Sequence, residues 1–150
     1  MKPLLLLLTF LLVSALSGCI TMPSDPFTTP VSVELGNSLA TDAMKQLETL
    51  YPPAHTTFNM SQPVTETDSF GTSLVFQMRE KGYAVQLINA KEPATVMAGL
   101  STQYTVDKPA SNGYANLYRV QLVVGKTTLT RAYSDGNNAA IPAGAWAKME

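Results

Sequence analysis

The hydrophobic positions in the middle of the chain first recur at intervals of three or four residues, which is the period of an α-helix. They predict a helix over Leu39–Tyr51, capped by Asn37 or Ser38 and ended by Pro52. After this helix, apolar and polar residues alternate over Thr56–Met60, which predicts a short strand. The helical stripe expected to face a core consists of Leu39, Ala43, Leu47 and Leu50.

A second helix carries clearer start and stop signals. Thr67 or Asp68 can cap it, and Gly82 can supply the left-handed residue that ends many helices. Gly71 inside this helix costs about 0.5–1 kcal/mol relative to alanine, so we expect a neighbouring strand or helix to approach closely there. Cations in the last turn oppose the negative end of the helix dipole. The apolar stripe is Phe70, Leu74 and Met78, and the cations are Arg79 and Lys81.

The remainder of the chain shows the composition and alternation of strands. Tyr83–Ile88 and Thr95–Val106 are expected strands, and residues 107–115 a turn-rich connection. Leu117–Val124 and Thr127–Ser134 flank Gly125-Lys126, a two-residue connection that predicts a tight hairpin. Residues 135–145, rich in Gly, Asn, Ala and Pro, are expected to be irregular.

The predicted hairpin has two different faces. In its first arm, Tyr118, Val120, Leu122 and Val124 share one face, and Arg119 and Gln121 share the other. In its second arm, Leu129, Arg131 and Tyr133 lie on one side. The order of elements predicts an α+β domain over residues 37–150, with two helices packed on a small, mainly antiparallel sheet.

The N-terminus has the pattern of an export signal. Lys2 precedes an uncharged apolar run of about 13 residues, whereas a membrane-spanning helix needs about 20. The run ends at Leu16-Ser17-Gly18-Cys19, which resembles the bacterial lipobox. We therefore expect residues 1–18 to be a lipoprotein signal peptide and Cys19 to be the lipid attachment site. Ile20 follows in place of the aspartate that retains such proteins at the inner membrane, so the resemblance implies the outer membrane, with the domain facing the periplasm.

Residues 19–36 contain three prolines and several Ser and Thr residues. Proline disfavours helix and sheet interiors, so this segment is expected to be a flexible linker between lipid and domain. It could instead become ordered against a partner subunit. Cys19 is the single cysteine, which excludes a disulfide within the chain.

Charge and composition argue against several kinds of partner. Without Lys2, nine basic residues remain against eleven acidic ones, a net charge of about −2, and no two cations are adjacent. Nucleic acids are bound by several convergent cations, so no direct nucleic-acid partner is expected.

Candidate catalytic or metal-binding residues are sparse. His55 is the single histidine and stands in a proline-containing connection, where a solvated side chain is expected. Glu66 and Asp68 are close enough in sequence to suggest an acid–base pair, but helix capping explains Asp68 without further function. The carboxylates show no calcium-loop spacing. We therefore expect no enzyme activity, no cofactor, no metal site and no small-molecule substrate.

Six short strings occur in one order along the chain: Leu50-Tyr51-Pro52-Pro53-Ala54, Asp68-Ser69-Phe70-Gly71-x-x-Leu74, Arg79-x-x-Gly82-Tyr83-Ala84-Val85, Leu117-Tyr118-Arg119-Val120, Leu129-x-Arg131-Ala132-Tyr133 and Ile141-Pro142-Ala143-Gly144-Ala145-Trp146. Together with the lipobox and the length, they resemble the conjugal transfer lipoprotein family TrbH. The resemblance covers nearly the whole mature chain, although no single string is diagnostic. It implies a structural or assembly component of the mating-pair formation apparatus of a plasmid type IV secretion system, in contact with other channel proteins.

The candidate partner surface is the Arg119 and Gln121 face of the hairpin, joined across it by Arg131 or Thr130 depending on the register. The alternative for this face is an ordinary solvated surface. Two other functions compete with the conjugation component: a generic periplasmic lipoprotein that binds a ligand or the cell wall, and a lipid-anchored hydrolase.

Overall fold

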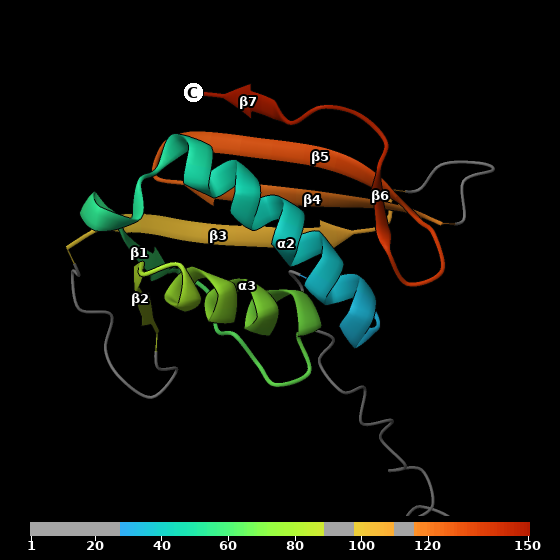
Figure 1. Cartoon of the computed structure of the whole chain (residues 1–150), viewed down its shortest axis with the longest axis horizontal. Helices are drawn as coiled ribbons and strands as arrows, with labels where there is room; N and C mark the ends of the chain where they lie inside the picture. The colour runs from blue at the N-terminus through green and yellow to red at the C-terminus, as the bar shows by residue number, and fades with distance from the viewer. Residues whose placement is uncertain (1–27, 89–97, 110–115) are drawn as a thin grey trace, which may run out of the picture.

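Two helices lie on one face of a seven-stranded mixed sheet in the computed structural model of the chain (Figure 1). The structure describes residues 28–88, 98–109 and 116–150. In chain order the elements are α2 (Val33–Leu50), the 3₁₀ helix η1 (Pro53–His55), β1 (Thr57–Met60), α3 (Ser69–Glu80), β2 (Ala84–Leu87), β3 (Leu100–Asp107), β4 (Leu117–Val124), β5 (Thr127–Asp135), β6 (Ala140–Pro142) and β7 (Ala147–Met149).

The strand order is β2-β1-β3-β4-β5-β6, and β7 pairs with the other half of β5. β1 is parallel to both β2 and β3, and the remaining pairs of named strands are antiparallel. The parallel pair β1 and β2 is joined through α3. The predicted α+β class, with two helices on a mainly antiparallel sheet, is confirmed. The sheet is larger than predicted, because β6 and β7 were not expected.

The predicted start of the first helix was wrong by six residues. Ser32 is its cap: the Ser32 side chain accepts a hydrogen bond from the Leu35 amide at 3.2 Å, and the helix runs from Val33. The start was not recognised because Gly36, in a segment with three prolines, is typical of a linker. A Cβ on Gly36 would lie 2.7 Å from the Ser69 Cβ, so the glycine lets the two helix starts approach. The last four residues of the predicted linker are therefore helical.

The second helix confirms its predicted cap and stripe. The Asp68 side chain accepts a hydrogen bond from the Gly71 amide at 2.9 Å, and Gly82 follows the helix with a φ of +85°. The close approach expected at Gly71 is also present, since a Cβ there would lie 1.9 Å from the Tyr104 hydroxyl of β3. The stripe residues Phe70, Leu74 and Met78 are all buried.

The hairpin β4–β5 has the predicted arms and turn, with Gly125 at a φ of +59°. The prediction that residues 135–145 are irregular was wrong in part. Asn137 and Asn138 both have positive φ and close a tight turn from β5 into β6, a geometry that asparagine tolerates better than most residues. Residues 95–97 of one predicted strand and 110–115 of the predicted connection lie outside the described residues. The predicted signal peptide, the predicted lipid attachment site Cys19 and residues 20–27 of the predicted linker also lie outside them.

One hydrophobic core fills the space between the helices and the sheet. The apolar stripes of α2 and α3 meet inward side chains of β1, β3, β4 and β5. The largest fully buried side chains of this core are Tyr104, Tyr133 and Phe58 from the strands and Phe70 from α3. Within the described residues, no helix is long and apolar enough to cross a membrane.

Candidate partner surface

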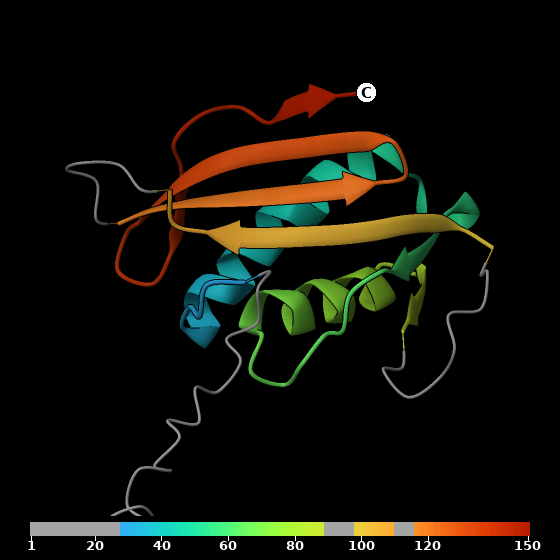
Figure 2. The same ribbon diagram turned by 180° about the vertical axis from the view of Figure 1, so that it is seen from behind.

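No helix among the described residues covers the face of the sheet opposite α2 and α3, which Figure 2 shows from behind and which we call the open face. Every second residue of β3, β4 and β5 points to it, because side chains alternate along a strand. Most of these residues are small or uncharged and polar. They are Ser101, Gln103, Thr105, Asp107, Leu117, Arg119, Gln121, Val123, Thr128, Thr130, Ala132 and Ser134.

Both predicted surface residues lie on this open face. Arg119 stands opposite Asp107 of β3, donates a hydrogen bond from Nε to Asp107 Oδ1 at 3.0 Å and makes a second contact with Oδ2. The hydrogen bond to Asp107 raises the pKa of Arg119, so the guanidinium stays charged. Gln121 is half-buried in the centre of the face, between Thr105 and Thr130 on the neighbouring strands.

The register decides which residue of β5 joins Gln121. Gln121 is paired with Thr130, while Arg131 is paired with Val120 and lies on the helix-covered face. Among these twelve described residues of the open face, one ion pair is present, Asp107–Arg119.

Arg131 belongs instead to a cluster centred on Asp42 of α2. Asp42 Oδ2 accepts hydrogen bonds from Arg131 Nη1 at 2.8 Å, from the Tyr133 hydroxyl at 2.7 Å and from Trp146 Nε1 at 3.2 Å. Burial, together with the hydrogen bond to Asp42, raises the pKa of Tyr133 far above its ordinary value. The hydroxyl is thus held in its protonated, donating form.

The same cluster holds the segment between β6 and β7. Arg131 Nε donates to the Gly144 carbonyl at 2.7 Å, and the Trp146 ring meets the Tyr133 ring edge-on at 6.4 Å between centroids. Two of the strings that carry the family resemblance, those of Arg131 and Trp146, therefore form one structural contact with α2. Asp42 was not predicted as the centre of a cluster. The signal for it was Arg131, a cation on the apolar side of a predicted strand, which indicates that a carboxylate faces it.

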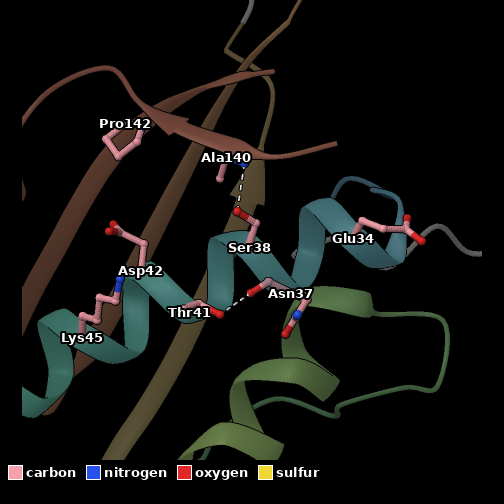
Figure 3. Close-up of a pocket in the computed structure, with 8 residues that line it drawn as sticks. All are labelled: Glu34, Asn37, Ser38, Thr41, Asp42, Lys45, Ala140 and Pro142. Carbon is pink, nitrogen blue, oxygen red and sulfur yellow. Dashed lines mark hydrogen bonds between the residues drawn. The ribbon is translucent and has the colours of Figure 1, made fainter. Parts of the chain in front are cut away.

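A polar surface groove of about 500 Å³ lies beside this cluster, between α2 and β6 (Figure 3). Ser38 on its wall accepts a hydrogen bond from the Ala140 amide at 3.0 Å, which fixes β6 against the helix. The charges in the groove have both signs, so they select no class of ion. The lining residues are Glu34, Asn37, Ser38, Thr41, Asp42, Lys45, Ala140 and Pro142.

The residues considered for catalysis lie apart or are used structurally. His55 is exposed on η1 and Glu66 is exposed before α3. Asp68 is buried, caps α3 and accepts a 2.5 Å hydrogen bond from the Tyr104 hydroxyl. Across the part of the chain that the structure describes, no three His, Cys, Asp or Glu side chains gather as metal ligands.

The family described as "Conjugal transfer protein TrbH" matches residues 21–150 of the chain. The match spans α2 to β7, and so includes the open face and the Asp42 cluster. No curated protein and no solved structure matches the chain. Because the family match covers far more than half of the chain, the chain belongs to the TrbH family of conjugal transfer proteins.

Proposed function

We propose that this protein is a lipid-anchored lipoprotein of the outer membrane that acts as a structural or assembly component of the mating-pair formation apparatus. The observation that carries this proposal is the TrbH match over residues 21–150. It is supported by the N-terminal sequence, which resembles a signal peptide and ends at the lipobox-like Leu16-Ser17-Gly18-Cys19. Cys19 would carry the lipid, and several acyl chains together give stable anchoring.

The open sheet face is the proposed contact with other proteins of the apparatus. The helices leave it uncovered, and its polarity comes from hydroxyl and amide groups with one compensated ion pair. The centres of protein interfaces are depleted in charged residues, and the charged residues that the described strands present on this face are the paired Asp107 and Arg119. Gln121 lies at the centre of this face, between Thr105 and Thr130, so a partner bound to the face would cover it.

The protein acts by contact and not by chemistry in this proposal. The two carboxylates that meet the core, Asp42 and Asp68, both hold structural donors: Asp42 binds three side chains, and Asp68 binds a helix amide and a tyrosine. Each carboxylate thereby joins a helix to a strand.

A mating assay with matched variants tests the proposal. Cys19→Ser should abolish labelling by a clickable fatty acid and reduce plasmid transfer, while the domain stays folded. Gln121→Arg should leave labelling intact and reduce transfer, because a long cation at the centre of the face separates the partner surfaces. Gln46→Arg is the matched control, since Gln46 is an equally half-buried glutamine on α2, across the sheet from the proposed contact.

His55→Ala distinguishes the contact mechanism from an enzyme. The exposed His55 has no role in the proposal, so transfer should be unchanged. A loss of transfer in His55→Ala alone, with the protein abundant and anchored, would contradict the contact mechanism. An equal loss of plasmid transfer in Gln121→Arg and Gln46→Arg would show that the open face is not the contact surface.

A further inference from the structure

The described chain begins at a fixed point on the sheet. Thr28 forms a parallel bridge with Val106 of β3, and the Thr29 amide donates to the Val106 carbonyl at 2.7 Å. A third contact follows at Val31, whose carbonyl accepts a hydrogen bond from the Ser69 hydroxyl at 3.0 Å. The segment before α2 is therefore attached to the domain from residue 28.

This attachment lies at one end of the strands, which we call the tether end. β3 finishes there, β4 begins there, and the Ser32 hydroxyl donates to Asn138 Oδ1 at 3.0 Å in the turn from β5 to β6. The opposite, far end carries the Gly125-Lys126 turn and the last turn of α2. Figures 1 and 2 both show these two groups of elements at opposite ends of the molecule.

We infer that the tether end faces the lipid surface and that the strands point away from it. This inference rests on the proposed lipid anchor at Cys19. Thr28 is the ninth residue after Cys19, and nine residues span at most about 30 Å when fully extended. The eight residues of β3 carry the far end about 25 Å further from the attachment point.

The orientation follows from the tether and not from adsorption. The described side chains at the tether end include the acids Glu34, Asp107 and Asp135 and the cations Lys108 and Arg119. A surface without a basic excess is not drawn onto anionic lipid. With the strands directed away from the membrane, the open face looks sideways along it, toward neighbours anchored in the same membrane.

Energy transfer to lipid tests this orientation. Full-length lipidated protein would be reconstituted in vesicles of phosphatidylethanolamine and phosphatidylglycerol that carry an acceptor dye on their headgroups. Glu34→Cys at the tether end and Lys126→Cys at the far end, both exposed, would each carry the donor dye, since the native cysteine is blocked by lipid. Transfer should be several-fold more efficient from position 34. Equal efficiencies, or stronger transfer from position 126, would overturn the orientation.

A proline variant tests the attachment itself. Thr29→Pro removes the amide that donates to the Val106 carbonyl, so the attachment before α2 is weakened and the difference between the two positions should shrink. Thr29→Ser keeps the amide and should keep the difference. An undiminished difference in Thr29→Pro would show that the bridge does not orient the domain. Protein that fails to float with vesicles would overturn the lipid anchor as well, whereas floating protein without the difference would overturn the orientation alone.

Discussion

The two faces of the sheet are built from the same strands, but their polar side chains have different partners. On the helix-covered face, two tyrosine hydroxyls meet carboxylates: Tyr133 of β5 bonds Asp42, and Tyr104 of β3 bonds Asp68. Each pair fixes one helix on the sheet. On the open face, hydroxyl and amide side chains point to solvent around the exposed ion pair Asp107–Arg119. Substitutions on the covered face should therefore lower the stability of the fold, while substitutions on the open face should affect binding of a partner protein.

The largest loss of stability is expected at the centre of the covered face. Leu74→Ala removes a fully buried side chain from α3, so the free energy of unfolding of residues 28–150 should fall by about 2–5 kcal/mol. Urea denaturation measures it. Phe76→Ala on the same helix is the control, because Phe76 is 63% exposed. Equal midpoints for the parent and Leu74→Ala would contradict the burial of this stripe.

Gly71→Ala adds a methyl group where the Tyr104 hydroxyl and Asp68 leave no room. Overpacking of this kind costs about 1–3 kcal/mol, and here it also disturbs the hydrogen bond between those two side chains. Thermal unfolding would measure the loss. Gly144→Ala is the matched control, since a Cβ there meets nothing within 4 Å. A similar effect of both substitutions would show that the approach of β3 to α3 is not tight.

Asp42→Asn removes the charge that binds Arg131 and weakens an acceptor shared by three donors. The pair is partly exposed, with side-chain exposures of 24% and 19%, so we expect a loss of about 1–3 kcal/mol. The fluorescence of Trp146, the single tryptophan, should report release of its indole. Asp107→Asn makes the same change on the open face and should leave both readouts nearly unchanged.

Tyr133 predicts a dependence of stability on alkaline pH. Its pKa is raised in the folded state, so above about pH 10 the folded protein keeps a proton that the unfolded chain releases. The stabilisation is complete below that pH and declines as the pH rises toward the raised pKa, with a slope of at most about 1.4 kcal/mol per pH unit. Tyr133→Phe should remove this part of the slope in urea denaturation series. Parallel slopes for the two proteins would contradict it.

The smallest effect on stability belongs to the open face. Replacing both Arg119 and Gln121 by alanine should change the free energy of unfolding by less than about 0.5 kcal/mol, because exposed ion pairs contribute little. Urea denaturation of the same fragment measures it. A loss as large as that of Asp42→Asn would mean that the two faces do not differ in the way described above.

The sequence by itself determined the elements whose signals are local. The α3 cap at Asp68, the end at Gly82 and the turn at Gly125 depend on residues within a few positions of each other, and all three were predicted. The alternation of β4 placed Arg119 and Gln121 on a common face for the same reason. The start of α2 was not predicted, because the reason for a glycine at position 36 is the close approach of Ser69 in α3, which is distant in sequence.

Only the tertiary structure decided which residues meet across the domain. The hairpin register placed Thr130 beside Gln121 and sent Arg131 to the covered face, since one residue of shift exchanges the two faces of a strand. Asp42 and Trp146 are 104 positions apart, and no local pattern connects them. The attachment of Thr28 to Val106 is likewise a long-range pairing between backbones, where side-chain type carries little information.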